Sequence, residues 1–132
     1  MPQTLSEPAR QLLDSVEYAT IATINPDGQP QLSVVWVKRD GDDVLVSTIR
    51  GRRKCLNLER DPRASILVYR RSDPDAYVEV RGRVTLTEEG GPELIQELGW
   101  RYNGVRFSGD DGHDRVRVVV RLTPNKVVTR NL

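Results

Sequence analysis

The stretch YVEVRGRVTL, residues 77–86, has the clearest pattern in this chain of 132 residues. Apolar residues alternate with polar ones along it, and Gly82 takes one of the apolar places. Successive side chains of a β-strand point to opposite faces, so the alternation predicts a strand with one buried face and one hydrated face. A glycine inside such a strand indicates a bend or the close approach of another backbone segment.

Shorter β-branched segments lie on both sides of this strand, separated by turn signals. The sequences NPDG (25–28), RDGD (39–42) and SDPD (72–75) are typical of turns. Connections this short join antiparallel strands, because a parallel crossover needs a dozen or more residues. The further strands expected from this pattern are residues 20–24, 31–38, 44–49, 64–69 and 115–122, with a last short one at 127–128.

Three segments have helical signals. Ser6 can cap a short N-terminal helix. A second helix over residues 51–61 should end at Pro62, because the residue before a proline disfavours the helical region. Residues 88–102 predict a third helix, and residues 104–114 a polar loop.

Six or seven strands with few helices favour a mainly β single domain over residues 1–132, built as a closed or nearly closed antiparallel barrel. Closure removes the exposed strand edges that an open sheet would leave. The run VVWV at residues 34–37 is apolar on both faces, which a lone barrel strand does not need. A homodimer that buries the outer face and coverage by the chain's own helices explain this run equally well.

Composition narrows the function classes. The formal net charge is only +1 and aromatic residues are sparse, which weighs against a nucleic-acid-binding barrel. Cys55 is the only cysteine, so an internal disulfide and a zinc cluster are excluded, and a reducing cytoplasm is the expected setting. Asp110, Asp111 and Asp114 lack the spacing of a calcium loop, so no metal site is expected. No stretch approaches membrane-spanning length, so no membrane partner is expected.

Positive charge is concentrated in TIRGRRKCLNLERDP, residues 48–62. Four of the five residues from Arg50 to Lys54 are cationic, and they stand where a strand gives way to a helix. Cations at a helix N-terminus oppose the helix dipole, whereas a bound anion would reverse that penalty and accept hydrogen bonds from free N–H groups. A solvated charged run and an anion site are the alternatives, and the position at the strand-to-helix junction favours the anion site.

Three blocks together resemble a known family. They are ATINPDGQPQLSVVWV (22–37), STIRGRRKCLNLERDPRASILV (47–68) and the alternating strand at 77–86. In order, over roughly residues 10–123, the chain resembles the split-barrel flavin and deazaflavin oxidoreductases, the pyridoxamine 5′-phosphate oxidase-like superfamily. The likeness is greatest to small actinobacterial-type members that use coenzyme F420.

The resemblance implies a six- to seven-stranded, FMN-binding-like split barrel and a homodimer with cofactor sites at the subunit interface. The residues that it places at the cofactor phosphate are Ser47, Thr48, Arg52 and Lys54. Those that it places along the cofactor ring are Gln31, Leu32, Ser33 and Val34. Arg50 would suit the acidic tail of F420, and Tyr77 would reach the partner subunit's cofactor.

The implied function is reduction of a small unsaturated organic substrate by hydride transfer from reduced F420. The alternatives are an FMN-dependent flavin reductase or pyridoxamine-phosphate-oxidase-like oxidase, and a non-catalytic F420 or FMN carrier. No acid–base set of residues is evident, so no catalytic residue is assigned. His113 is expected in an exposed loop, Cys55 in packing, and Trp36 in the core rather than against the ring.

Overall fold

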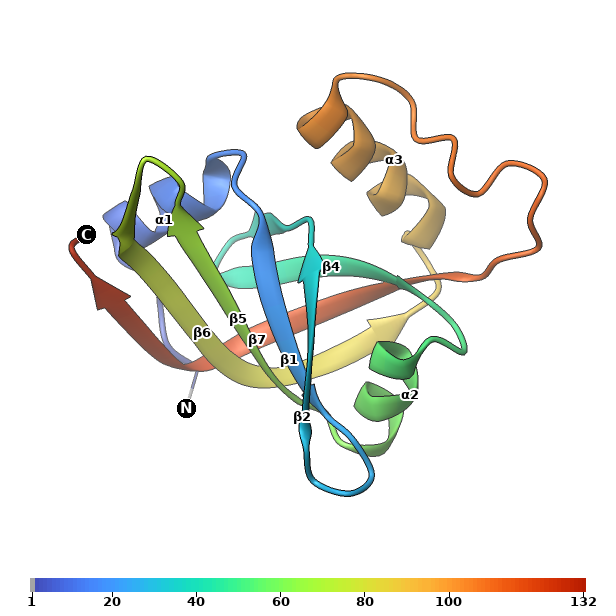
Figure 1. Ribbon diagram of the computed structural model, residues 1–132, viewed down its shortest axis with the longest axis horizontal. Helices are drawn as coiled ribbons and strands as arrows, with labels where there is room; N and C mark the ends of the chain where they lie inside the picture. The colour runs from blue at the N-terminus through green and yellow to red at the C-terminus, as the bar shows by residue number, and fades with distance from the viewer. Residues whose placement is uncertain (1) are drawn as a thin grey trace.

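Seven antiparallel strands and three helices make up residues 2–132, which the computed structural model describes (Figure 1). In chain order the elements are α1 (Glu7–Asp14), β1 (Ala19–Ile24), β2 (Pro30–Val35), β3 (Lys38–Asp40), β4 (Asp43–Ile49), α2 (Arg53–Arg60), β5 (Arg63–Arg70), β6 (Asp73–Thr87), α3 (Gly91–Asn103) and β7 (Arg117–Arg130). The expected mainly β class is confirmed, as is the cap of α1, where the Ser6 side chain accepts a hydrogen bond from the Ala9 N–H.

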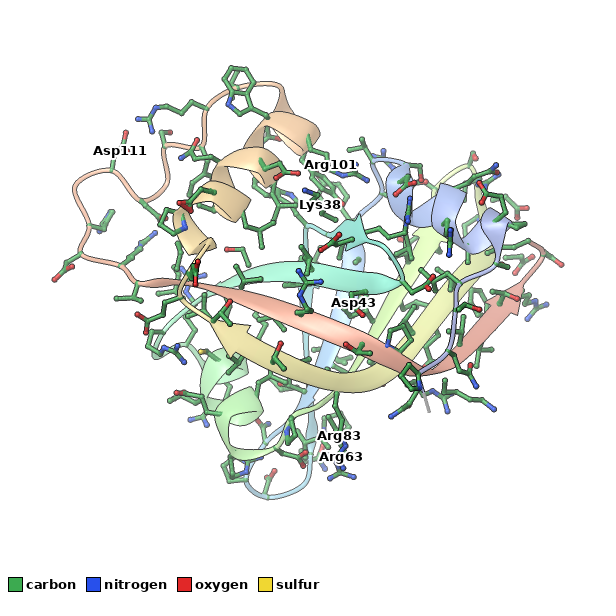
Figure 2. All side chains as sticks on the ribbon, turned by 180° about the vertical axis from the view of Figure 1, so that it is seen from behind. Lys38, Asp43, Arg63, Arg83, Arg101 and Asp111 are labelled. Carbon is green, nitrogen blue, oxygen red and sulfur yellow. The ribbon has the colours of Figure 1, made fainter. Side chains whose placement is uncertain are left out.

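The strands form one sheet in the order β2-β1-β5-β6-β7-β4-β3. Its two edge strands, β2 and β3, are joined by only Trp36 and Val37, so the sheet must curl until its edges meet at that corner. Seen from behind, β7 runs between β4 and β6 across the barrel (Figure 2). The expected seven-stranded split barrel is confirmed.

Two expected strand boundaries were wrong. The segment 31–38 is not one strand, because the Val37 N–H leaves the ladder and donates to the Tyr102 hydroxyl at 3.1 Å. The segments 115–122 and 127–128 belong to one strand, β7, which passes Pro124 through a register shift beside Gly82. The expected close approach at Gly82 is confirmed, because a Cβ there would lie 2.0 Å from the Thr123 carbonyl oxygen.

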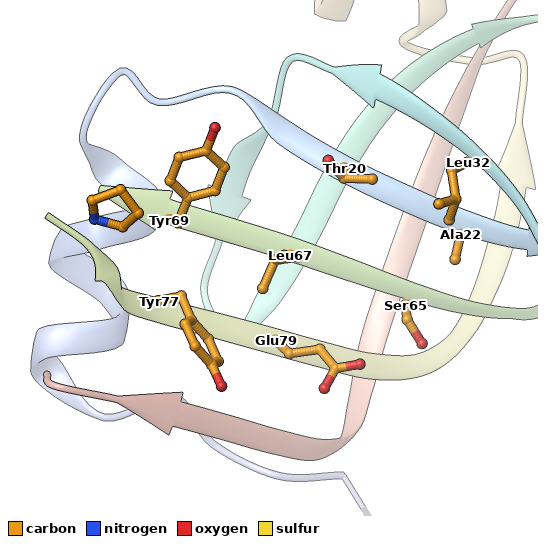
Figure 3. A pocket seen from close by; sticks show the side chains of 9 residues that line it. Thr20, Ala22, Leu32, Ser65, Leu67, Tyr69, Tyr77 and Glu79 are labelled. Atoms are coloured by element: carbon orange, nitrogen blue, oxygen red, sulfur yellow. The ribbon is translucent and has the colours of Figure 1, made fainter. Parts of the chain in front are cut away.

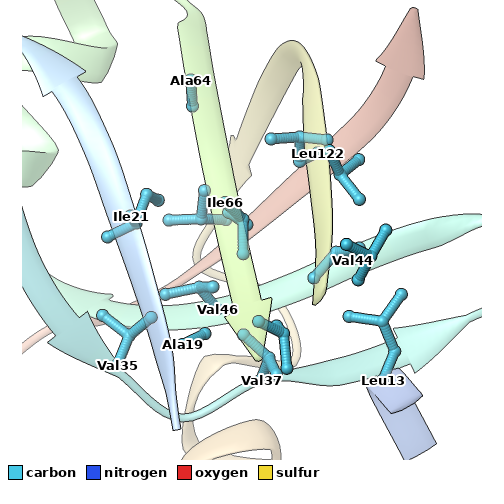
Figure 4. Close-up of a cluster of buried hydrophobic side chains, with 14 of the residues drawn as sticks. Leu13, Ala19, Ile21, Val35, Val37, Val44, Val46, Ala64, Ile66 and Leu122 are labelled. Atoms are coloured by element: carbon cyan, nitrogen blue, oxygen red, sulfur yellow. The ribbon is translucent and has the colours of Figure 1, made fainter. Parts of the chain in front are cut away.

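The main core fills the barrel (Figure 4). Ile21, Val46 and Ile66 come from three strands and are almost fully buried, and Leu13 of α1 closes one end. A second, smaller cluster lies outside the barrel, where α3 packs on β4 and β7. The apolar run 34–37 is divided between these layers and solvent: Val35 and Val37 enter the core, Trp36 packs on α3, and Val34 stays 70% exposed.

Candidate functional site

A pocket of about 260 Å³ opens between β2, β4, the start of α2, α3 and the start of β7. We call it the cationic pocket. Its residues are Val34, Val35, Trp36, Ser47, Arg52, Lys54, Ile95, Leu98, Phe107, Arg115 and Arg117. Four cations thus meet an apolar wall in one small space, and the two helices that border it extend from the same side of the barrel (Figure 1).

Lys54 is the most enclosed of the cations that the sequence predicted here. Its ammonium donates to the Ser33 hydroxyl of β2 at 3.1 Å. Burial lowers the pKa of Lys54 from its usual value, and the nearby charges of Arg52 and Arg117 lower it further. An anion in the pocket would offset both the burial of Lys54 and its repulsion by the arginines, because a nearby negative charge stabilises the charged ammonium.

Arg52 stands at the N-cap of α2 and is exposed. Its side chain makes no hydrogen bond to the helix, and the first turn of α2 holds no acidic residue. The N–H groups of that turn and the Arg52 guanidinium therefore remain available to an anion in the pocket.

Arg117, the first residue of β7, is a pocket residue that the sequence reasoning did not assign. Its side chain is 10% exposed and its guanidinium lies 5.1 Å from the centre of the Phe107 ring. It donates to the Ser47 hydroxyl at 3.3 Å and forms an ion pair with Asp110 at 2.7 Å. The signal in the sequence was the spacing of Arg115 and Arg117, two positions that share one face of a strand.

Ser47 and Thr48 lie on opposite faces of β4. Ser47 borders the cationic pocket. Thr48 is 2% exposed and follows the buried Val44 and Val46 on the core side, where its hydroxyl has no hydrogen-bond partner among residues 2–132. Strand alternation turns the Thr48 side chain into the barrel, so the structure does not bring it together with Ser47 at the cationic pocket.

The remaining cations of the basic stretch lie outside the pocket. Arg50 forms ion pairs at 3.2 Å with Glu59 and Glu88. Arg53 borders a separate shallow depression beside Asn25 and Asp27. Arg50 thus lies beside two glutamates rather than in the pocket, and its role at an acidic cofactor tail stays a prediction.

The strand expected along the cofactor ring divides by face. Gln31 accepts a hydrogen bond from the Thr23 hydroxyl at 2.8 Å, and Ser33 accepts the one from Lys54. Leu32 and Val34 point the other way and are 63% and 70% exposed. Gln31 and Ser33 thus face α2, whereas Leu32 and Val34 face outward.

A buried polar network that the sequence did not reveal fixes α2 against the barrel. Asn57 is fully buried, and its amide donates to the Thr23 hydroxyl at 3.0 Å and to the Asn25 side chain at 2.9 Å. Buried polar groups need such partners, so this network holds the helix in one place. Lys54, one turn earlier on the same helix, is positioned with it.

Outward-facing side chains of β1, β2, β5 and β6 form a second hollow of about 480 Å³ (Figure 3). We call it the outer apolar face. Its residues are Thr20, Ala22, Leu32, Ser65, Leu67, Tyr69, Pro74, Tyr77 and Glu79. Tyr77 therefore lies here and not in the cationic pocket.

The other singled-out residues have local partners or face solvent. Trp36 stacks on Tyr102 with ring centres 5.4 Å apart and meets the edge of Phe107. Cys55 is buried, and His113 lies exposed in the loop between α3 and β7. Within residues 2–132, no group of His, Cys, Asp and Glu is arranged to hold a metal, and no helix is long and apolar enough to cross a membrane.

Residues 5–131 match the family described as pyridoxamine 5′-phosphate oxidase. Among solved structures, an F420 reductase is 26% identical with a TM-score of 0.84, covering 94% of this chain and 98% of its own. A conserved hypothetical protein from Mycobacterium tuberculosis is 27% identical with a TM-score of 0.80, covering 96% of this chain and 85% of its own. An FMN-binding, pyridoxamine 5′-phosphate oxidase-related protein from Nostoc punctiforme shares the fold at 17% identity, with a TM-score of 0.64 over 84% of this chain and 72% of its own.

Proposed function

This chain belongs to the pyridoxamine 5′-phosphate oxidase family of flavin- or F420-binding split-barrel proteins, and we propose that it is an F420-dependent reductase of a small unsaturated organic substrate. The observation that carries the proposal is the cationic pocket, where Arg52, Lys54 and Arg117 converge beside β2. The similarity to an F420 reductase over nearly the whole chain supports the choice of cofactor.

The donors of the pocket fit a phosphate group. Arginine offers two-point hydrogen bonding to phosphate and lysine a compact charge, and the Ser47 hydroxyl adds a neutral donor. Arg52, Lys54, Arg117 and Ser47 would hold the cofactor phosphate. When bound, reduced F420 would supply the hydride that the substrate accepts. The apolar wall that includes Trp36 would exclude water.

Strand β2 is suited to contact the cofactor ring. It pairs only with β1, so half of its backbone N–H and C=O groups face away from the ladder. We propose that these groups in the segment from Gln31 to Val34 bind the polar atoms of the ring. The side chains of Gln31 and Ser33 are already hydrogen-bonded within the chain, so the proposal assigns the ring contacts chiefly to the backbone.

We propose a cytoplasmic homodimer that buries the outer apolar face. Leu32 of β2 is 63% exposed there, and Leu67 and Tyr69 lie nearby on β5 at 37% and 42% exposure. Removing such side chains from water is the main favourable term in association. Tyr77, on the same face, would then reach the partner subunit's cofactor.

Titration of the purified protein with F420 and with FMN tests the cofactor. We expect a colourless protein that binds F420 in the micromolar range, leaves FMN unbound, and oxidises reduced F420 when enones or quinones are added. A yellow protein whose flavin spectrum survives desalting would instead establish FMN. Binding without turnover would identify a carrier, and binding of neither cofactor would overturn the proposal.

Lys54→Ala tests the site. Losing a charge-assisted contact to phosphate should weaken F420 binding by about 1.5–3 kcal/mol. Arg53→Ala is the matched control, because it removes a cation from the adjacent position without touching the cationic pocket. Equal affinities of the wild type and Lys54→Ala would remove Lys54 from the site.

A further inference from the structure

The cationic pocket has its own counter-ion on the loop between α3 and β7. Asp110 forms two hydrogen bonds with the Arg117 guanidinium, at 2.7 Å and 2.9 Å, and one with Arg115 at 3.2 Å. Two of the four cations that border the pocket are therefore partly neutralised, while Arg52 and Lys54 form no ion pair within residues 2–132.

We propose that Asp110 competes with the bound anion for Arg117 and so sets the affinity of the cationic pocket. The inference rests on the proposed function, in which that pocket holds an anionic group. A phosphate that enters the pocket meets a guanidinium already paired with a carboxylate, and it is repelled by that carboxylate at short range. The negative charge of Asp110 thus limits binding.

Arg117 does not need Asp110 to stay in place. Its guanidinium also donates to Ser47 and lies over the Phe107 ring, and its side chain is 10% exposed. Contacts from β4 and from the aromatic ring should therefore keep the donor directed at the pocket when the carboxylate is removed. This separates a counter-ion from a residue that merely orients Arg117.

Asp110 itself is held at a defined position. Phe107 anchors the loop through two hydrogen bonds with the Gln96 side chain, at 2.8 Å and 3.1 Å. Gly99 and Gly109 fit closely against Phe107, where an added Cβ would lie 2.8 Å and 2.5 Å from its atoms. An anchored carboxylate acts as a constant local charge, and its partly buried pair with Arg117 is screened by salt less than an exposed pair would be.

Asp110→Asn tests the proposal, because it removes the charge and keeps the shape. The probe is inorganic phosphate, titrated by calorimetry at low ionic strength. We expect phosphate to bind about threefold to tenfold more tightly than to the wild type, with a smaller gain in high salt. Asp111→Asn is the matched control: Asp111 pairs with Arg106 on the outer part of the loop and should leave the affinity unchanged (Figure 2).

A folded Asp110→Asn variant whose phosphate affinity is unchanged or reduced would overturn the proposal, as would the absence of phosphate binding to both proteins. If that variant does not fold, Asp110→Ser removes the same charge and must show the same gain, whereas Asp110→Glu keeps the charge and must not. In an Arg117→Gln background the gain should shrink, since the carboxylate acts through that arginine.

The phosphate measurement does not depend on the identity of the cofactor. A wild type that binds phosphate but not F420 would overturn the proposed cofactor and leave the Asp110 comparison decisive. A wild type that binds F420, with phosphate affinity indifferent to Asp110→Asn, would overturn only the counter-ion.

Discussion

The cationic pocket and the outer apolar face share strand β2, but their side chains differ in whether they find partners within the chain. In the pocket, Lys54 bonds to Ser33, and Arg117 to Ser47 and Asp110. On the outer apolar face, Leu32 and Tyr69 have solvent where packing partners would be, and they expose 63% and 42% of their surface. Polar groups that are enclosed in a chain must find partners there, whereas exposed apolar groups gain only when another surface covers them.

This contrast separates what one chain supplies from what an association would add. The donors for an anion are assembled by β4, α2 and β7 of a single chain. The proposed dimer would use the opposite face of the strand. A substitution in the pocket should therefore leave dimer formation unchanged, and one on the outer apolar face should leave anion binding unchanged.

The largest effect is expected from a substitution in β6 that would disrupt the barrel on which both regions are built. Gly82→Val places side-chain atoms where a Cβ alone would be 2.0 Å from the Thr123 carbonyl oxygen. Strand β6, which pairs with β5 and β7, would have to shift, and we expect a loss at or beyond the upper end of about 1–3 kcal/mol in the free energy of unfolding. Urea denaturation measures it.

Thr85→Val is the control on the same strand, because Thr85 is exposed and the change only replaces its hydroxyl with a methyl group. Equal stability of Gly82→Val and Thr85→Val would contradict the close approach of β6 and β7.

The second prediction tests the outer apolar face by placing a charge on it. Leu32→Asp puts a charge on the outer apolar face, and a charged group at the proposed interface would be buried without a partner. We expect the variant to be a monomer by light scattering at concentrations where the wild type is a dimer. Phosphate binding, which uses donors of one chain, should remain.

Leu56→Asp is the matched control, since Leu56 is exposed on α2 and lies outside the outer apolar face. A wild type that is itself a monomer at all accessible concentrations would refute the proposed dimer.

The sequence predicted the strands of the barrel in more detail than the residues of the pocket. Alternation at 77–86 predicts the barrel, and VVWV at 34–37 leaves dimer and helix cover open. The structure places Trp36 under α3 and leaves Val34 exposed, because a strand sends neighbouring residues to opposite faces. The basic stretch predicted an anion site, but its charges alone do not show which cations bind other residues of the chain. The fold pairs Arg50 with Glu59 and Glu88 and leaves Arg52 available to the pocket.

The residues that sequence reasoning missed are those joined by distant contacts. Arg117 is 63 positions after Lys54 in the numbering, and both border the pocket only because β7 pairs with β4. Asn57 is an ordinary polar residue of a short helix until the barrel buries it against Thr23. Contacts of this kind depend on strand order, which local patterns do not encode.

A third, smaller effect is expected from pH on the polar side of the comparison. Burial and two neighbouring arginines lower the pKa of Lys54, so its ammonium loses the proton below the usual range of lysine. Phosphate affinity should therefore fall as the pH rises through that lowered pKa, while the arginines stay charged. Without ligand the sign is opposite: the unfolded chain binds more protons in this window, so the fold gains stability as the pH rises.

Lys54→Arg is the variant that isolates this effect. Arginine keeps its charge throughout, so the alkaline decline in phosphate affinity should flatten in a calorimetric titration. A decline of the same size in both proteins would show that another group controls it.

The smallest effect is expected at the joint between the two regions, where α2 ends and β5 begins. Asp61 accepts hydrogen bonds from the Arg63 side chain at 3.0 Å and 2.8 Å, and this pairing lowers the pKa of Asp61 to about 2. A depressed pKa contributes stability above the ordinary value of 3.8, and that contribution is lost as the pH falls through about 2. Asp61→Asn should lower the melting temperature slightly near neutral pH, with the difference vanishing in strong acid.

Asparagine keeps an oxygen that can accept the Arg63 backbone N–H, so this substitution removes the charge and leaves the local turn. A melting-temperature difference that stays constant down to about pH 2 would show that shape, not charge, matters at the joint. Phosphate binding should be the same in both proteins, because Asp61 follows α2 at the end away from Lys54. A change in phosphate affinity would instead show that the apolar strand β5 and the cationic pocket are coupled through this turn.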